Sequence, residues 1–232
     1  MTDKIPYSFI WTPKYEVFAK ILKDKMRKYS FLEDKSFFIP QEIWDANANK
    51  GPGHFMTGCS LKLQAVYKLL HELPNDSYFI FSDADILLFP DQPFYELLDL
   101  YRKVGADIVF MREHYETMFS NVGFSFIKVN DVNKDLFARA IKMFEKEPNG
   151  LDGSNINECL KTYTGTHFWF PSELVATTCS LKQQDEIVYR QAKMRSKLIV
   201  YQALCDADKP TASQIYQKLE KYQILGIPIQ FK

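Results

Sequence analysis

The sequence YFIFSDADILLF, residues 78–89, is an apolar and aromatic run that carries two aspartates, Asp83 and Asp85, in its second half. A half-exposed strand would alternate with polar residues, so this run predicts a central β-strand that is buried on both faces. Burial of an unpaired carboxylate is costly, and the two aspartates are therefore expected to share a partner. On a continuous strand both side chains would point to one face, whereas a turn at Ala84 would let the second carboxylate swing round a bound ion.

Asp83 and Asp85 predict a site for a divalent metal ion and a diphosphate at the mouth of the sheet. Hard divalent cations take oxygen ligands and commonly bridge protein carboxylates to phosphate oxygens. The alternative is that the aspartates only cap a turn after the strand, as aspartate often does. The apolar run resumes at residues 86–89, so the aspartates interrupt buried sequence and do not end it, which favours the metal site.

Length and composition indicate a single α/β domain. A chain of 232 residues can bury most of the surface that its unfolded form exposes. We expect a core over about residues 5–208 and a docked C-terminal helix over about 209–232. The 29 basic and 29 acidic side chains balance and are scattered along the chain, so no nucleic-acid partner is expected.

The cysteines and the N-terminus bear on the expected compartment. Cys59, Cys159, Cys179 and Cys205 stand far apart without a paired spacing or matching histidines, and we interpret them as reduced thiols with no zinc site. The N-terminal apolar patch is too short for the core of a signal peptide, and no run reaches membrane-spanning length. These features predict a cytoplasmic chain without a transmembrane segment.

The N-terminal third of the chain reads as a β-α-β unit. Strands are expected at residues 7–11 and 36–40, on either side of an amphipathic helix at 15–29, which predicts parallel strands covered by helices. A loop rich in glycine and asparagine at 47–58 and a helix at 59–73 then lead into the central strand.

The rest of the chain continues to alternate between helices and strands. Helices are expected at residues 94–104, 132–146, 151–160, 182–197 and 211–225, strands at 107–112, 121–129 and 198–204, and a strand or loop at 162–171. The last helix is amphipathic and is predicted to dock on the body of the domain. Asp131 is expected to be the N-cap of the helix that follows it.

Three further polar or glycine positions have both a structural and a functional interpretation. Lys62, near the start of its predicted helix, is placed to help the helix end hold an anion, or is simply solvated. Gly123 lets the backbone approach a ligand closely, or relieves a bulge. Asp152 either complements the helix dipole at the start of its helix or acts as a base that faces the ligand end of the sheet.

The order of these features resembles the nucleotide-diphosphosugar glycosyltransferases of the GT-A fold. The matching features are a helix, the apolar strand with Asp83-Ala84-Asp85, a second strand, Asn121-Val122-Gly123 and an Asp-opened helix. The resemblance covers roughly residues 7–208, and its most specific part is YFIFSDADILLF with the preceding SLKLQAVYKLL. It implies a mixed, mainly parallel, Rossmann-related central sheet flanked by helices, with a C-terminal helical extension. It also implies a metal-dependent, hexosyltransferase-like enzyme that moves a sugar from a UDP- or GDP-sugar to an acceptor hydroxyl, of a glycan or another molecule.

The resemblance also implies residue roles. Asp85 would coordinate Mn²⁺ or Mg²⁺, which bridges the two phosphates of the donor, and Asp83 would contact the ribose or the water shell of the metal. The acceptor hydroxyl loses its proton as it attacks, so an inverting enzyme supplies a carboxylate base, and we assign Asp152 to that role. A retaining enzyme would need no such base. The residues implied to bind the donor are Trp11, Thr12, Tyr15, Lys62, Asp83, Ala84, Asp85, Asn121 and Gly123.

The sequence departs from the family at one position. Many members place a histidine on or after a late strand as a further metal ligand, whereas here the predicted strand offers Gln202, followed by Asp206 and Asp208. An aspartate could take over, water could fill the position, or the metal could bind more weakly. The histidines that no spacing supports are His54, His114 and His167.

Two other functions compete with sugar transfer. A phosphatase of the haloacid dehalogenase type also uses Asp-x-Asp after an apolar strand, but that motif usually lies on the first strand and continues with Gly-Thr, whereas Ile86-Leu87 follow here. A non-catalytic domain that binds nucleotide sugars or acts as a scaffold would fit the absent late histidine. The intact Asp83 and Asp85 argue against the scaffold, because the pair has little structural reason to stay.

Overall fold

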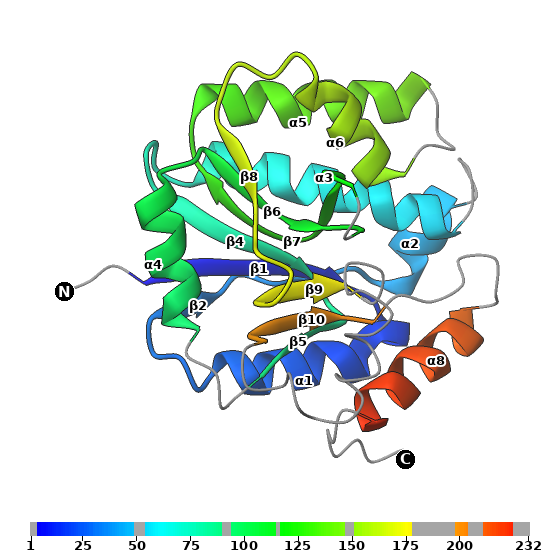
Figure 1. The fold of residues 1–232 in the computed structure, drawn as a ribbon. Coiled ribbons are helices and arrows are strands. Elements are labelled where there is room, and N and C mark those ends of the chain that lie inside the picture. The colour runs from blue at the N-terminus through cyan, green and yellow to red at the C-terminus, as the bar shows by residue number, and fades with distance from the viewer. Residues whose placement is uncertain are drawn as a thin grey trace.

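A ten-stranded mixed sheet flanked by helices forms the body of the chain (Figure 1). The computed structural model describes residues 4–48, 54–89, 94–114, 117–146, 151–177, 198–203 and 211–224. Within these ranges no helix is both long enough and apolar enough to cross a lipid bilayer.

The elements alternate along the chain much as the sequence predicts. The strands are β1 (Ile5–Trp11), β2 (Leu32–Asp34), β3 (Phe37–Phe38), β4 (Tyr78–Asp83), β5 (Ile86–Leu88), β6 (Ile108–Arg112), β7 (Ser120–Lys128), β8 (His167–Trp169), β9 (Val175–Thr177) and β10 (Val200–Gln202). The helices are η1 (Pro13–Tyr15), α1 (Glu16–Met26), α2 (Gln41–Ala48), α3 (His54–Glu72), α4 (Tyr95–Val104), α5 (Asp131–Lys146), α6 (Asp152–Leu160) and α8 (Thr211–Ile224).

The sheet has the strand order β2-β1-β4-β7-β6-β9-β10-β5, with β3 also beside β1 and β8 also beside β6. Strands β5 and β7 run antiparallel to their neighbours, and the other described pairings are parallel. The predicted mixed, mainly parallel sheet is therefore confirmed. Because the carboxyl ends of parallel strands meet at one edge, polar residues that follow them are gathered there.

The central run forms two strands and not one. β4 ends at Asp83, the chain turns at Ala84 and Asp85, and β5 then pairs with β10 at the far end of the strand order. The prediction of one continuous strand is wrong, and the alternative turn at Ala84 is confirmed. Both strands are buried, as the apolar sequence predicts, because each lies inside the sheet or under a helix.

The region between β1 and β4 contains more structure than the sequence analysis expects. β2 and α2 were not predicted, β3 is shorter than the predicted strand 36–40, and α3 begins at His54 and not at residue 59. The predicted loop 47–58 is therefore wrong over its described ends. Its glycine, proline and asparagine residues masked the helical sequence on both sides.

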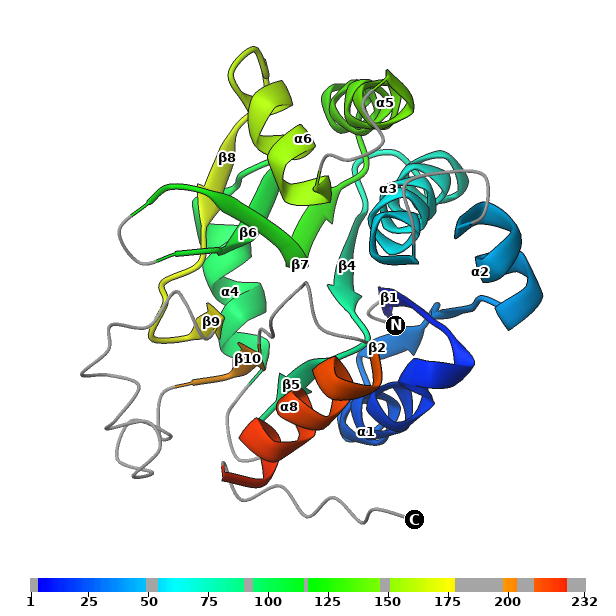
Figure 2. The ribbon, with the colours of Figure 1, turned by 90° about the vertical axis from the view of Figure 1, so that its right-hand side faces the viewer.

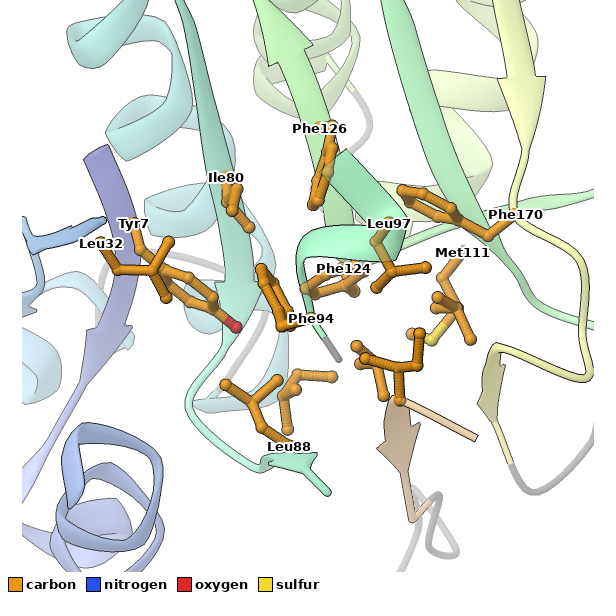
Figure 3. Packing of buried hydrophobic residues seen from close by; sticks show 14 of the residues in the cluster. Tyr7, Leu32, Ile80, Leu88, Phe94, Leu97, Met111, Phe124, Phe126 and Phe170 are labelled. Carbon is orange, nitrogen blue, oxygen red and sulfur yellow. The ribbon is translucent and has the colours of Figure 1, made fainter. Parts of the chain in front are cut away.

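Two apolar clusters hold the helices to the two faces of the sheet. One cluster joins α1 and α4 to the sheet, and the other joins α3, α5 and α6 to the opposite face. Figure 3 shows the first, in which Phe124, Phe126 and Phe170 pack with ring centroids 5.2–5.7 Å apart. Each fully buried phenylalanine contributes about 1.5–3 kcal/mol, so this aromatic layer fixes β7 at the centre of the sheet.

The C-terminal helix docks on the body, as predicted. Leu219 and Tyr222 of α8 pack against Phe18 of α1 and Leu87 of β5 in a third apolar cluster, and Figure 2 shows α8 beside these elements. The predicted helix 182–197 lies outside the described residues.

The N-terminus of α5 and two of the cysteines bear on two local predictions. The side-chain oxygen of Asn130 accepts a hydrogen bond from the Asn133 amide at 3.0 Å, so Asn130 caps α5 and the assignment of that role to Asp131 is wrong. Cys59 and Cys159 are free thiols, as predicted, and both are buried, which raises the pKa of Cys59 to about 12. Cys179 and Cys205 lie outside the described residues.

Candidate functional site

The Asp83-Ala84-Asp85 turn lies at the carboxyl end of β4, where several strands end together. Asp83 is opposite Ile10 near the end of β1, and Gln202 on β10 is opposite Ile86, the residue after the turn. Ala84 is buried, so the turn is packed into the body and its two carboxylates are held close to the neighbouring strand ends.

Lys62 joins two of the predicted acidic residues. Its ammonium nitrogen lies 2.7 Å from Asp83 Oδ1 and 2.6 Å from Asp152 Oδ2, and its side chain is 14% exposed. The longer α3 places Lys62 in the middle of the helix, so the argument from the helix N-terminus is wrong even though the residue lies at the site. Lys62 reaches the carboxylates because it is on the face of α3 that covers the sheet.

The ion pairs of Lys62 shift the protonation of the groups involved. Burial opposes the charge of Lys62, but Asp152 and then Asp83 raise the pKa of its ammonium well above the ordinary value. Burial alone would raise the pKa of Asp83, but the nearby charge of Lys62, with help from Lys218 and Gln202, holds that pKa below its usual range. Asp83 and Lys62 therefore stay charged at neutral pH.

Asp152 is fixed by the docking of α6. Asn157 exchanges two hydrogen bonds of 2.9 Å with the backbone of Ser120, which ties α6 to the start of β7. This contact places Asp152, the first residue of α6, over the sheet edge. Its Oδ1 accepts a hydrogen bond from the Gly153 amide at 2.8 Å, and its Oδ2 faces Lys62.

Asp85 is bound by side chains from the C-terminal part of the chain. Lys218 of α8 donates to Asp85 Oδ2, and the Tyr222 hydroxyl donates to the Asp85 backbone carbonyl. The Asp85 side chain is 4% exposed, so its charge is compensated inside the protein and not by solvent. Neither Lys218 nor Tyr222 was identified from the sequence as part of the site.

Gln202 connects the two aspartates. Its amide nitrogen donates to Asp83 Oδ2 at 2.7 Å and to Asp85 Oδ1 at 3.1 Å. Its carbonyl oxygen is buried and has no hydrogen-bond partner among the described residues. The two carboxylates therefore converge on the amide nitrogen of Gln202, while the amide oxygen of the same side chain lies beside Gly123 with unused acceptor capacity.

Gly123 provides the space for this convergence. A β-carbon at Gly123 would lie 2.5 Å from Gln202 Oε1, 2.6 Å from Asn121 Oδ1 and 2.9 Å from Asp83 Oδ2, all closer than an ordinary contact. The pairing of β6 with β7 shifts register between Phe110 opposite Ser125 and Met111 opposite Asn121, so Gly123 lies in an irregular stretch of the strand, as the bulge interpretation predicts. Its close approach to a ligand stays a prediction.

Asn121 links the glycine to a carboxylate that the sequence analysis did not select. Asn121 Oδ1 accepts a hydrogen bond from the Gly123 amide at 2.6 Å, and Asn121 Nδ2 donates to the carboxylate of Glu113, which follows β6. Burial raises the pKa of Glu113 above its ordinary value, and the charges of Asp152 and Asp83 raise it further. Glu113 could be found only once β6 and β7 were paired, because it stands 8 positions before Asn121 in the chain.

The three residues predicted to contact the nucleotide lie at and after the end of β1. The Trp11 ring packs against Phe38 with centroids 4.7 Å apart and ring planes tilted by 51°, and Phe38 is 50% exposed. Thr12 is buried, and the ring of Tyr15 lies 6.0 Å from the ammonium of Lys218. The structure thus places Tyr15 beside the cation that holds Asp85, while Trp11 and Phe38 form a partly exposed aromatic surface nearby.

Among the candidate histidines, the structure places His167 away from the site. His167 pairs with Ile108 at the start of β6, at the opposite end of that strand from Glu113, and burial lowers its pKa. His114 follows Glu113 after the end of β6, and the side chain of His54 is outside the described set. Asp206 and Asp208 lie outside the described residues.

The site offers two carboxylates and one neutral amide oxygen, a set of donors that suits a divalent ion. The described residues contain no group of three or more His, Cys, Asp or Glu side chains that could hold a metal ion. Asp83 and Asp85 with the unpartnered carbonyl of Gln202 do provide oxygen donors of the kind that Mn²⁺ and Mg²⁺ take.

Comparison with known proteins identifies the fold. The sequence matches no family model and no curated protein. A crystal structure of a glycosyltransferase involved in glycosylation of the major capsid of PBCV-1 matches with a TM-score of 0.63 over 93% of this chain and 99% of that one, at 8% identity. The galactosyltransferase LgtC, in complex with donor and acceptor sugar analogues, matches with a TM-score of 0.54 over 96% and 95%, at 13% identity. Mouse xyloside xylosyltransferase 1 matches with a TM-score of 0.52 over 89% and 100%, at 9% identity. The chain therefore has the GT-A-type fold that these glycosyltransferases share.

Proposed function

We propose that this protein is a metal-dependent glycosyltransferase that moves a sugar from a UDP- or GDP-sugar to an acceptor hydroxyl, such as that of a glycan. The observation that carries the proposal is the convergence of Asp83 and Asp85 on one buried point at the end of β4. Similar folds in proteins that transfer sugars support the same reaction class.

The proposed metal is Mn²⁺ or Mg²⁺, held by Asp83 and Asp85. Gln202 is the proposed neutral ligand in place of the expected histidine, since its amide can turn so that the carbonyl faces both carboxylates. When bound, such an ion neutralises the negative charge that develops on a diphosphate leaving group.

The surrounding residues would bind the donor and orient it. Trp11 and Thr12 at the end of β1 are proposed to contact the base and ribose, with Tyr15 next to them. Lys62 fixes the rotamers of Asp83 and Asp152 and provides a positive charge near the diphosphate. Asn121, Gly123 and Ala84 would line the sugar, since they form the close-packed floor beside Asp83.

Asp152 is the proposed base for an inverting reaction. It lies at the edge of the site, on the N-terminal end of α6. Its carboxylate contacts Lys62, which also contacts Asp83. Its contact with Lys62 would orient the carboxylate toward an acceptor hydroxyl, from which it would take the proton. Glu113 is the other carboxylate in the site that could accept a proton, and its hydrogen bond to Asn121 would orient it.

Calorimetry followed by a turnover assay tests the proposal. UDP and GDP are titrated into the protein with and without Mn²⁺, and hydrolysis of UDP- and GDP-sugars is then measured. We expect nucleotide binding that depends on Mn²⁺ and is lost in the Asp83→Asn, Asp85→Asn double variant. Metal-dependent binding with no hydrolysis or transfer would favour the scaffold, and no binding of either nucleotide would refute the proposal.

The role of Asp152 is tested by two carboxylate-to-amide changes of similar size. Asp152→Asn should lower turnover about 10²–10⁴-fold, the usual contribution of a general base, while UDP or GDP binding is retained. Glu113→Gln is the matched variant on the other side of the site. Wild-type turnover in Asp152→Asn together with a large loss in Glu113→Gln would move the role of base to Glu113.

A further inference from the structure

A polar stripe on α8 faces the site and not the solvent. Gln214, Lys218 and Tyr222 follow one another at four-residue spacing on one face of the helix, and they are 7%, 7% and 1% exposed. A helix that docks only by packing buries an apolar stripe, as Leu219 does beside them. Burial of a lysine needs a specific partner, because a buried unpaired charge is strongly destabilising.

The partner of Lys218 is the carboxylate that we assign to the metal. Lys218 donates to Asp85 Oδ2, and the side chains of the two residues are 9% and 4% exposed. Asp85 Oδ1 accepts a hydrogen bond from Gln202, so both carboxylate oxygens have partners. Tyr222 holds the same helix to the backbone carbonyl of Asp85, which fixes the position of α8 independently of the ion pair.

We propose that Lys218 is an internal cation that competes with the divalent ion for Asp85 and so sets the affinity of the metal site. This inference rests on the proposed function only in taking Asp85 as a metal ligand. The Asp85 oxygen that shares a partner with Asp83 is Oδ1, so an ion at that point would share the Asp85 carboxylate with the ammonium on Oδ2, and the two positive charges would repel each other inside the protein. This repulsion favours withdrawal of Lys218 when the metal binds, so the free energy of its ion pair with Asp85 is subtracted from the affinity for the metal.

Binding of Mn²⁺ alone, with no nucleotide, tests this competition. Lys218→Met removes the ammonium and keeps much of the aliphatic stem, so Mn²⁺ should bind the full chain at least about tenfold more tightly by calorimetry. Lys218→Gln is a second neutral variant, for use if the methionine variant folds poorly, because its amide can still hydrogen-bond Asp85. Both variants should be less heat-stable than wild type without metal, and should regain more stability in Mn²⁺ than wild type does.

Two control variants separate charge from packing. Tyr222→Phe removes the hydroxyl that holds α8 to Asp85 and leaves the ammonium, so the affinity for Mn²⁺ should stay within about threefold of wild type. Lys218→Arg keeps a positive charge at the same position and should likewise give no tenfold gain. Equal or weaker Mn²⁺ binding by both neutral variants would overturn the proposal, as would tightening of the same size in Tyr222→Phe.

The wild-type chain offers a measurement that needs no variant. Lysine acetylation followed by peptide mass spectrometry should show slow labelling of Lys218 in metal-free protein and faster labelling in Mn²⁺. Lys20, which is 70% exposed, should label equally in both conditions. Unchanged labelling of Lys218 at saturating Mn²⁺ would contradict its withdrawal. Because these measurements use the metal alone, they are independent of whether UDP or GDP binds.

Discussion

Gly123→Ala is the sharpest test of the site geometry, because it adds a single carbon. The strand conformation of Gly123 suits alanine, since Gly105 is the one glycine of the described residues with a positive φ. Any effect must therefore come from contacts. The new β-carbon would meet side-chain oxygens of Gln202, Asn121 and Asp83 at 2.5, 2.6 and 2.9 Å.

The expected cost follows from what those oxygens already do. To reach 3.4 Å, the Gln202 oxygen must retreat by about 0.9 Å and the Asp83 oxygen by about 0.5 Å. The first two movements strain the hydrogen bond of Gln202 to Asp83 at 2.7 Å. The Asn121 oxygen must also retreat, by about 0.8 Å, which strains its hydrogen bond from the Gly123 amide at 2.6 Å. Overpacking costs about 1–3 kcal/mol, so we expect a loss of about 2 kcal/mol. For a chain of this size that lowers the melting temperature by about 4–8 °C.

Thermal and urea unfolding measure this loss, and Mn²⁺ titration measures the effect on the site. Gly153→Ala is the matched control, because its β-carbon would approach its nearest neighbour, the Ser120 carbonyl oxygen, only to 3.3 Å. We expect Gly153→Ala to change stability by less than about 0.5 kcal/mol. If Gly123→Ala had wild-type stability and Mn²⁺ affinity, then Gln202, Asn121 and Asp83 would not converge as described, and the proposed metal site would lose its basis.

Two further substitutions test the electrostatics of the site. Lys62→Met leaves the partly buried carboxylate of Asp83 and the buried carboxylate of Asp152 without their cation and should cost about 3–5 kcal/mol in urea unfolding at pH 7, whereas Lys20→Met on the surface should cost about 0–1 kcal/mol. Glu113→Gln should stabilise the protein at pH 7, because the raised pKa of Glu113 means that its charged form is disfavoured in the folded state. This penalty on the stability of the wild type is present in full above the pKa that Glu113 has in the folded state, and it vanishes below the unfolded value of about 4.3. The wild type and Glu113→Gln should therefore become equally stable near pH 4. A difference in stability that widened on acidification would contradict the raised pKa of Glu113.

The fold could be predicted from the sequence wherever the pattern was local. The apolar run at 78–89 predicted burial correctly, and the alternation of strands and helices predicted a mainly parallel sheet. The break at Ala84 could not be decided, because it depends on β5 pairing with β10, which follows it by more than a hundred residues. Short elements such as β2 and α2 have too few residues to show a period.

The candidate site could likewise be predicted only where its residues are marked by the local sequence. The cost of burying charge identified Asp83 and Asp85 without any knowledge of their neighbours. Lys62 was selected by an argument that its position in α3 does not support, although it does contact Asp83. Glu113 and Lys218 reach the site only through tertiary contacts. The four-residue spacing of Gln214, Lys218 and Tyr222 was a visible signal for Lys218, but the apolar neighbours of the same helix concealed it.

The charge balance of the site explains why its parts come from such distant segments. Asp85 and Asp152 are buried and Asp83 is partly buried, and three like charges around the same two lysines and Gln202 would repel one another strongly in a protein interior. Lys62 compensates two of them from α3, and Lys218 compensates the third from α8. The acidic turn could therefore fold before any ion arrives, with its carboxylates already directed to one point. On the proposed competition, an ion that then binds would have to displace an ammonium, so the arrangement that lets the turn fold in the absence of metal would also limit how tightly the metal is held.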